Sequence, residues 1–216
     1  MDLDHEAQHG PGVVGRLEHA PHEVVAVVAI VVRLPNQFQE GLTPFAEASH
    51  LFEEFEHTAW RLETQQGYAS DRRSEKWQRW LNGEDIAREP ENRWHLNVRA
   101  QTALGKRFER VRIVDDPPTD GQRYLLDTAP NNVAAGEDMR NLARAEAIRL
   151  GLPEFDFWLF DSRVMMKFHF DAEGTTLGVE VIEDASDVLA ACQARDASWH
   201  YAIRTREYRE RVRSTV

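Results

Sequence analysis

Three strand-like runs towards the C-terminal end of the chain constrain its fold most strongly. The runs are Phe155–Phe160, Val164–Phe170 and Leu177–Ile182. They are separated by two polar segments, Asp161-Ser162-Arg163 and Asp171-Ala172-Glu173-Gly174. Short polar turns between apolar runs are typical of an antiparallel meander. The sequence therefore predicts a sheet in which each run pairs with the next.

The first of these runs carries the most distinctive side chains, DFWLFD over Asp156–Asp161. In a strand, alternate residues point to opposite faces, so Asp156, Trp158 and Phe160 share one face. Two interpretations of the aspartates stay open. In the structural one, Asp156 pairs with an arginine or caps the strand entry, and Asp161 starts the turn through an Asx bond. In the functional one, a carboxylate stands at the mouth of an aromatic pocket.

Apolar spacing and capping residues predict three helices earlier in the chain. Apolar residues recur near helical spacing over 45–64, which predicts one long helix. Ser74 is a good N-cap and Gly83 a plausible stop, so a short second helix is expected between them. A third helix is expected over 91–104.

A strand and a further helix are expected in the middle of the chain. The segment 108–114, FERVRIV, alternates apolar and charged residues, which predicts a half-buried strand. Thr119 or Asp120 then caps a helix that runs through Leu126. We expect Pro130-Asn131-Asn132 to interrupt that helix, because proline disrupts a helix interior.

The remaining elements complete the predicted architecture. Residues 137–150 fit a helix or a strand, and Ser186 is expected to cap a long helix that continues past Trp199 to Ile203. The arginine-rich tail after it fits a solvated helix end or a contact for an acidic partner or a phosphate. The fold class predicted is α/β, of the α+β kind, with a central mixed sheet, an antiparallel C-terminal meander and flanking helices.

Net charge and apolar patterning exclude several classes of protein. The formal net charge is −11, so direct binding to nucleic acid is not expected. The single cysteine, Cys192, cannot form an internal disulfide or a cysteine-based zinc site. The longest apolar run, Val24–Val32, is too short to span a membrane, and the acidic N-terminal residues do not fit a secretory signal. These features predict a cytoplasmic protein without contact to a membrane.

The first 43 residues differ in texture from the rest of the chain. They hold four of the nine histidines, and no aromatic residue occurs before Phe38. His5-Glu6-Ala7-Gln8-His9 matches the H-E-x-x-H zinc pattern, but Gly10-Pro11-Gly12 would break its helix at once, so no metal site is expected. We predict that residues 1–43 are a poorly ordered or atypical N-terminal extension, although Val24–Val32 could also form a buried strand. Residues 44–213 are predicted to form a single α/β domain.

Polar residues beside the aromatic ones are candidates for a site. His169 could form an acid/base pair or a surface contact with Asp171, and Glu180 could join it from the next strand. Arg61 and Glu63 could line a site only if the predicted helix unwinds there. The predicted binding residues are Trp60, Arg61, Glu63, Asp156, Trp158, Phe160, Asp161, His169 and Glu180. The sequence contains no glycine-rich phosphate loop, and no cofactor is expected.

Six segments occur in an order that carries a family resemblance. They are FEHTAWRLET, WLNGE, RVRIVDDPPTDGQRYLL, NNVAAGED, DFWLFD and LGVEV, starting at positions 55, 80, 110, 131, 156 and 177. Together they resemble the domain-of-unknown-function family numbered 6879, small proteins of actinobacteria, over residues 45–205. Its members are often encoded beside helix-turn-helix regulators, so the resemblance implies a regulatory or accessory role. It also implies a strand at Asp138–Arg144.

The order of the predicted elements is also similar to the degenerate phospholipase-D-like domains of some bacterial regulators. The active form of that fold needs an H-x-K motif, and no histidine of this chain has a lysine two residues later. The analogy concerns the fold alone, and it implies that this phosphodiesterase chemistry is absent.

Two hypotheses of different classes follow. In the first, the chain is a non-enzymatic regulatory or accessory binding module that acts with a helix-turn-helix regulator and recognises that protein or a small-molecule ligand through its aromatic residues. In the second, it is a hydrolase or transferase that uses Asp156, Asp161 and Glu180 with His169. Convergence of these groups in one pocket would favour the enzyme.

Overall fold

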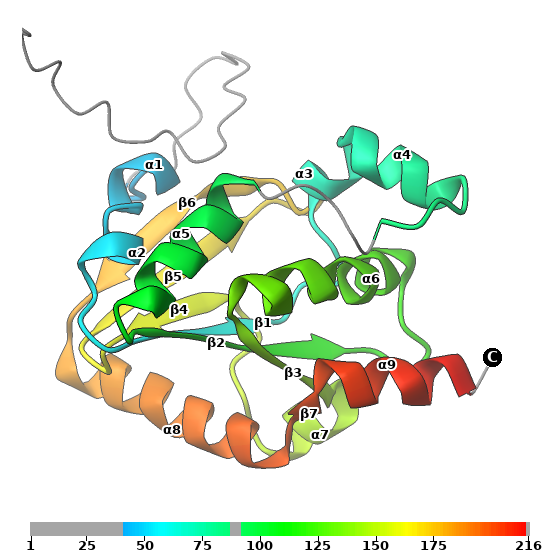
Figure 1. Cartoon of the computed structure of the whole chain (residues 1–216). Coiled ribbons are helices and arrows are strands. Elements are labelled where there is room, and N and C mark those ends of the chain that lie inside the picture. The colour runs from blue at the N-terminus through cyan, green and yellow to red at the C-terminus, as the bar shows by residue number, and fades with distance from the viewer. Residues whose placement is uncertain (1–40, 87–91, 215–216) are drawn as a thin grey trace, which may run out of the picture.

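A seven-stranded mixed sheet forms the centre of the molecule (Figure 1). The structure is a computed structural model that describes residues 41–86 and 92–214. The order of the strands across the sheet is β6-β5-β4-β1-β2-β3-β7. Their bounds are β1 Thr58–Glu63, β2 Arg107–Val114, β3 Asp138–Ala143, β4 Phe157–Phe160, β5 Val164–Phe170, β6 Thr176–Ile182 and β7 Ile203–Arg204. The predicted fold class, a mixed sheet with flanking helices, is confirmed.

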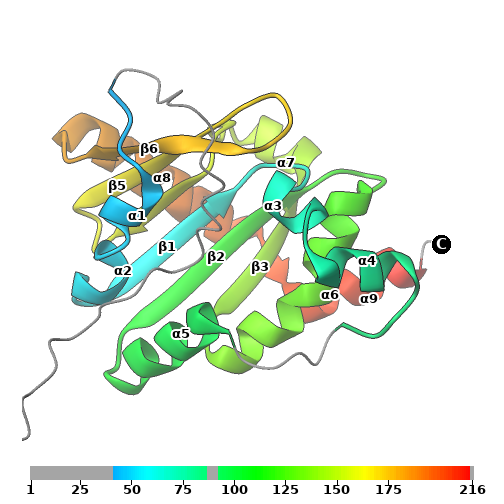
Figure 2. The same ribbon diagram turned by 90° about the horizontal axis from the view of Figure 1, so that it is seen from above.

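The sheet joins a parallel half to an antiparallel half. Strands β1, β2 and β3 are parallel, whereas β4 runs antiparallel to β1. Strands β4, β5 and β6 pair in sequence order, which confirms the predicted meander. Thr43 adds an isolated bridge to Val179 on the outer strand. The carboxyl ends of the three parallel strands therefore lie along one edge of the sheet, where α3 and the loops beyond β1 and β2 are found (Figure 2).

Helices cover both faces of the sheet. In Figure 1 the helices α1 to α6 lie above the sheet, α7 and α8 lie below it, and α9 packs beside α6 and β3. The bounds are α1 Phe45–Ala48, α2 Leu51–Glu54, α3 Ala69–Arg72, α4 Glu75–Leu81, α5 Arg93–Ala103, α6 Asp120–Ala135, α7 Arg144–Arg149, α8 Ala185–Tyr201 and α9 Thr205–Ser214. We call the side of α5 and α6 the upper face and the side of α8 the lower face.

The alternation of the strands divides the hydrophobic core into two main layers. On the lower face, Trp60 and Leu62 pack with Phe157 and Leu159 against α8. On the upper face, Trp158 and the neighbouring rings of β4 and β2 pack against α1, α2 and α5. The predicted alternation of the DFWLFD run is confirmed, because its aromatic side chains enter both layers.

The prediction of one helix over 45–64 is wrong. The range begins with two short helices, α1 and α2, and the second of them ends at Glu54. The chain then forms strand β1 between β2 and β4. The residues of β1 alternate in period two, with Trp60 and Leu62 on one face and Arg61 and Glu63 on the other. That alternation fits a strand, and pairing on both sides overrides the helical spacing of the apolar residues.

The helix through Leu126 is longer than predicted. Thr119 caps α6 as expected, but the helix includes Pro130 and ends only at Ala135, before Gly136 at φ 120°. Proline removes one helical hydrogen bond. The helix nevertheless continues, because Ala129 and Ala135 are both buried on its inner face.

Other predictions of caps and boundaries are confirmed or corrected in detail. Ser74 caps α4, α5 occupies most of 91–104, and the ambiguous stretch forms β3 and then α7. The N-cap of α8 is Asp184 rather than Ser186, since its carboxylate accepts from two backbone N–H groups in the first turn. Strand β2 is almost wholly buried rather than half-buried. The predictions for His5 to His9 and for Val24–Val32 lie outside the described residues.

Candidate functional site

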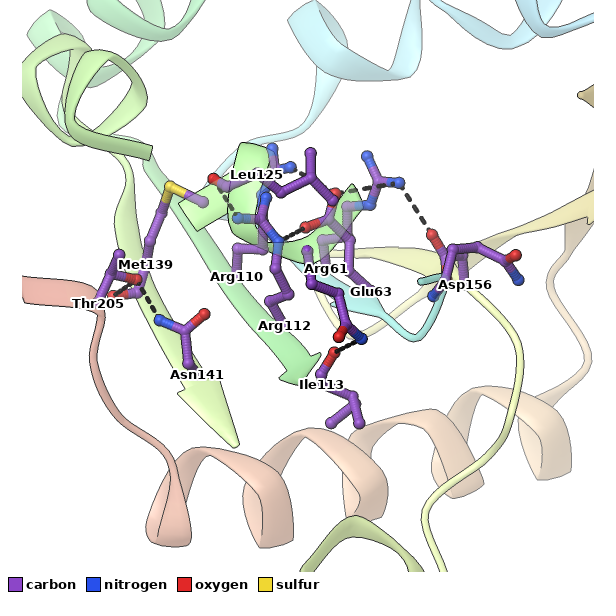
Figure 3. A network of polar contacts seen from close by, with 12 residues as sticks. Arg61, Glu63, Arg110, Arg112, Ile113, Leu125, Met139, Asn141, Asp156 and Thr205 are labelled. Carbon is purple, nitrogen blue, oxygen red and sulfur yellow. Dashed lines mark hydrogen bonds and ion pairs between the residues drawn. The ribbon is translucent and has the colours of Figure 1, made fainter. Parts of the chain in front are cut away.

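Five buried charged side chains and the partly buried Arg61 form a continuous network on the upper face of the sheet, most of which is seen in Figure 3. Strands β1 and β2 place most of them, because Arg61 pairs with Arg110 in the register and Glu63 pairs with Arg112. Paired residues of parallel strands point to the same face. The network consists of Arg61, Glu63, Arg110, Arg112, Glu137 and Asp156, which is three cations and three anions.

Glu63 stands at the centre of the network. Its Oε1 accepts a hydrogen bond of 2.8 Å from Arg110, and its Oε2 accepts one of 2.7 Å from Arg112. Burial by itself would raise the pKa of Glu63, whose exposure is 2%. Arg110, Arg112 and Arg61 outweigh that effect and hold the pKa of Glu63 well below its ordinary value. The carboxylate therefore stays ionised inside the protein.

The two arginines of β2 anchor the network to the helices above it. Arg110 donates to Glu137, which also accepts a hydrogen bond from the indole of Trp94 on α5. Arg112 donates to the carbonyl of Leu125 on α6 at 2.8 Å. Arg110 also lies 5.4 Å from the centre of the Trp158 ring. The network thus fixes β1 and β2 relative to both covering helices.

Arg61 lies in a box of aromatic rings. Its guanidinium carbon is 5.3–5.7 Å from the ring centres of Tyr68, Trp158 and Phe168. It also donates to Asp156 at 3.0 Å. Burial opposes a charged Arg61, but Tyr68, Glu63 and Asp156 more than compensate and raise its pKa above the ordinary value. Arg61 therefore remains a permanent cation in this box.

Asp156 fixes the end of strand β1. Its carboxylate is fully buried and accepts from the backbone N–H of Thr64 at 2.6 Å and from the Thr64 hydroxyl at 2.9 Å. The hydroxyl of Tyr68 donates to its other oxygen. Burial, and then the charge of Asp156, raise the pKa of Tyr68, so the phenol stays protonated and keeps donating. Five donors from one short stretch of chain converge on this carboxylate when Arg61 and the backbone N–H of Gln65 are included.

A buried network of this kind is weak evidence for stability. Desolvation of an ion costs several kcal/mol, and well-packed apolar residues of similar volume are often as stable or more stable. The three positive and three negative charges give the network a net charge of zero. This balance limits the free-energy cost of burying it, but it does not make the network necessary for folding. Perturbed ionisable groups gather at functional sites, so the network marks the candidate site of this protein.

Asp71 on α3 is an additional carboxylate beside the balanced set. No hydrogen bond or ion pair from the described residues reaches its side chain, although the charges of Glu63, Arg112 and Arg61 act on it. Burial, and then the negative charge of Glu63, raise the pKa of Asp71 from 3.8 to about 6. Its side chain is thus half-buried and still open to a hydrogen-bond donor.

We expect Asp71→Asn to stabilise the protein by about 2 kcal/mol at pH 7 and by less than about 1 kcal/mol near pH 4. A carboxyl whose pKa rises on folding supports the folded state while it is protonated. That support is lost as the pH rises from the ordinary pKa of 3.8 to the folded pKa of about 6, and asparagine does not titrate. Urea unfolding at both pH values measures the difference. An equal effect of the substitution at pH 4 and pH 7 would contradict the raised pKa.

A polar groove of about 620 Å³ lies at the carboxyl ends of the parallel strands. Its walls are the loop after β1, the N-terminal end of α6, the first residue of α7 and the turn between β5 and β6. The lining residues are Thr64, Gln65, Gln66, Gly67, Arg72, Thr119, Gly121, Arg144, Glu154, Ala172, Glu173 and Gly174. Thr64 connects the groove to the charged network, because its side chain and its N–H are both bound to Asp156. Ligands of open α/β sheets bind at this edge of the sheet.

Gly121 sets the close approach of two walls of the groove. A Cβ atom at this position would lie 2.3 Å from the carbonyl oxygen of Gln66 and 2.8 Å from the Cα of Gly67. Both are backbone atoms, so the loop would have to move. We expect Gly121→Ala to destabilise the protein by about 1–3 kcal/mol and to shift the NMR signals of residues 64–67. Asp120→Ala, at the exposed neighbouring position, should change neither; unchanged loop signals in Gly121→Ala would refute the close approach.

The structure brings together one part of the predicted site residues. Arg61, Glu63 and Asp156 meet in the network, with the pairing of Asp156 to an arginine that the structural interpretation expected. Trp60, Trp158 and Phe160 lie in the two core layers, with exposures of 0–2%. They therefore cannot form the recognition surface that the first hypothesis gave to them, because apolar rings on a doubly covered sheet are packed inside.

The other predicted site residues lie apart from the network. Asp161 is at the far end of β4, where its carboxylate accepts from the backbone N–H groups of Glu56, His57 and Thr58 rather than making the expected Asx bond. His169 contacts Glu180 at 3.4 Å on the partly exposed opposite face of the sheet. The four groups of the enzyme hypothesis thus do not converge. Among residues 41–86 and 92–214, no group of three His, Cys, Asp or Glu residues could hold a metal ion.

Several members of the site were missed by the sequence analysis. Arg110 and Arg112 alternate with apolar residues in β2, which is also the pattern of a solvent-facing side. Their buried partners come from other segments, so only tertiary structure reveals them. One signal in the sequence could have revealed them. Arg110 and Arg112 lie on the same face of the strand as the large apolar residue Phe108, which is almost fully buried.

A comparison with known protein families gives a match over most of the chain. A family described as "Domain of unknown function (DUF6879)" matches residues 46–210, which is most of the chain. The search of curated proteins finds no match. Within the described residues, no helix is both long enough and apolar enough to cross a membrane.

Proposed function

The chain belongs to the family described as a domain of unknown function, DUF6879, and we propose that it is a non-enzymatic binding module for a small polar molecule. The ligand binds in the groove at the carboxyl ends of β1, β2 and β3. The observation that carries this proposal is that Asp156 belongs to the buried network through Arg61 and also holds Thr64 in one wall of the groove.

The network makes the groove rigid before a ligand arrives. Asp156 holds the N–H and the hydroxyl of Thr64, and Arg144 donates to the Thr64 carbonyl at 2.7 Å. Thr119 holds the next part of the loop, since its hydroxyl donates to the carbonyl of Gln66 at 2.7 Å. A site whose polar groups are fixed in place loses less entropy on binding.

The lining determines the chemistry of the ligand. Backbone groups, threonine hydroxyls and amide side chains form most of the wall, while Arg72 and Arg144 supply two positive charges and Glu154 and Glu173 supply two negative ones. Such a surface favours a hydrophilic molecule that is bound by hydrogen bonds and is uncharged or zwitterionic. The volume falls within the range of about 300–1,000 Å³ that is usual for small-molecule sites.

The biological role in this proposal is regulatory or accessory. It rests on the family resemblance, which associates such proteins with helix-turn-helix regulators. In this reading, occupancy of the groove changes how the protein acts with a regulator. The half-buried Asp71 lies close to the network. The loop after β1, which would contact the ligand, therefore has a titratable carboxyl nearby.

Native mass spectrometry of the protein isolated from its own cells tests the proposal. The full chain is compared with Ala172→Trp, which places an indole in the groove, and with Ala190→Trp, at another exposed alanine, on α8. We expect a small-molecule adduct on the wild-type protein and on Ala190→Trp, and none on Ala172→Trp. An adduct that survives in Ala172→Trp, or an unliganded wild-type protein, would overturn the proposal.

A further inference from the structure

A second cavity, of about 860 Å³, lies between the C-terminal half of α6, the start of β3 and α9. It is separate from the groove, since the two share no lining residue. Its apolar part is formed by Pro130, Val133, Ala134 and Met139. Val133 is 48% exposed, so an apolar patch of this cavity is left open to solvent.

The carboxylates that line this cavity are already paired. Glu137 is bound by Arg110 of the buried network, which approaches from inside the protein. Asp138 lies 3.6 Å from Arg140, and Glu210 lies 3.4 Å from Arg206. None of them is thus an unbalanced negative charge that would repel an anion.

Two guanidinium groups in the lining have unused donors. Arg209 binds Asp127 at 3.2 Å through one terminal nitrogen, but its Nε–H is buried and has no acceptor within the described part of the chain. Arg204 is exposed and makes no ion pair with any described residue. A buried donor without an acceptor is costly, and an anionic oxygen beside it would remove that cost.

From this arrangement we propose that the cavity binds a small amphipathic anion, with an apolar body and one carboxylate end. The apolar body lies on Pro130, Val133 and Met139, and the carboxylate accepts from Arg204 and from the Nε–H of Arg209. A cavity of this volume is suited to a small molecule and less suited to the flat surface of a protein partner. This proposal is independent of the function proposed for the groove.

Three matched probes test the proposal on the full chain. Octanoate, octan-1-ol and octylammonium have the same apolar chain, and their head groups are negative, neutral and positive. Each is titrated into the ¹⁵N-labelled protein, and the amide signals of residues 130–139 and 204–210 are followed. We expect octanoate to shift these signals at lower concentration than octan-1-ol, and octylammonium to bind most weakly.

Three variants separate the cavity from other apolar sites. Ala134→Trp fills the cavity and should abolish these shifts, whereas Ala190→Trp, in a different cavity beside α8, should leave them unchanged. Arg204→Ala should weaken octanoate about fivefold or more and leave octan-1-ol unaffected, because it removes only a charged donor. Equal binding of octanoate and octylammonium, persistence of the shifts in Ala134→Trp, or no shift in these residues would each overturn the proposal.

Discussion

Replacing Glu63 with glutamine should destabilise the protein by about 3–5 kcal/mol, the usual cost of removing one partner from a buried ion pair. The substitution keeps the size of the side chain and removes its charge. Arg110 and Arg112 would then share one surplus positive charge in the interior, where their 2.8 Å and 2.7 Å contacts now end on Glu63. Urea unfolding at pH 7 measures the loss.

A matched control and a second substitution test whether the loss comes from the buried charge of Glu63. Glu180→Gln removes a carboxylate that is 46% exposed in its side chain, and it should cost less than about 1 kcal/mol. Adding Arg112→Met to Glu63→Gln removes the surplus charge and should recover part of the lost stability, a coupling that is usual for neighbours in one network. A loss in Glu63→Gln no larger than that in Glu180→Gln would mean that Glu63 is not buried among the arginines.

Replacing Asp156 with asparagine should have the second largest effect, also about 3–5 kcal/mol. The amide removes the charge opposite Arg61 and puts an N–H₂ group near donors that now point at a carboxylate. The N–H of Thr64 and the hydroxyl of Tyr68 would lose an ionic acceptor. Since this carboxylate holds the wall of the groove, exchange protection of the Thr64 amide should fall roughly a hundredfold, which corresponds to about 3 kcal/mol.

An exposed aspartate provides the comparison. Among the residues that the structure describes, Asp196 pairs with its neighbour Arg195 alone, and its side chain is 70% exposed, so Asp196→Asn should change neither stability nor exchange. Unchanged protection of Thr64 in Asp156→Asn, together with full stability, would show that the carboxylate does not hold the loop.

The part of the fold that follows from local sequence could be predicted. The meander of β4, β5 and β6 has polar turns at fixed positions between apolar runs, so its pairing needs no distant information. The caps Ser74 and Thr119 act on backbone groups two or three residues away, and both were found. Asp184 was missed because Ser186, close by, is also a good capping residue.

Strand β1 could not be predicted in the same way. Its apolar residues fit helical spacing together with those of α1 and α2, and only its partners β2 and β4, about 50 and 100 residues later in the chain, decide for a strand. The site could not be predicted for the same reason. Arg61, Glu63 and Asp156 were candidates, but their partners on β2 and before β3 meet them only through parallel pairing, which the sequence does not reveal.

The buried network requires that Glu63 stays ionised inside the folded protein, and this ionisation can be measured. Its side-chain carboxyl carbon can be followed by NMR in ¹³C-labelled protein from pH 7 down to the onset of acid unfolding. Because three arginines hold its pKa far below the ordinary value of 4.5, we expect no titration of this carboxyl while the protein stays folded. A titration midpoint near 4.5 in the folded protein would contradict it.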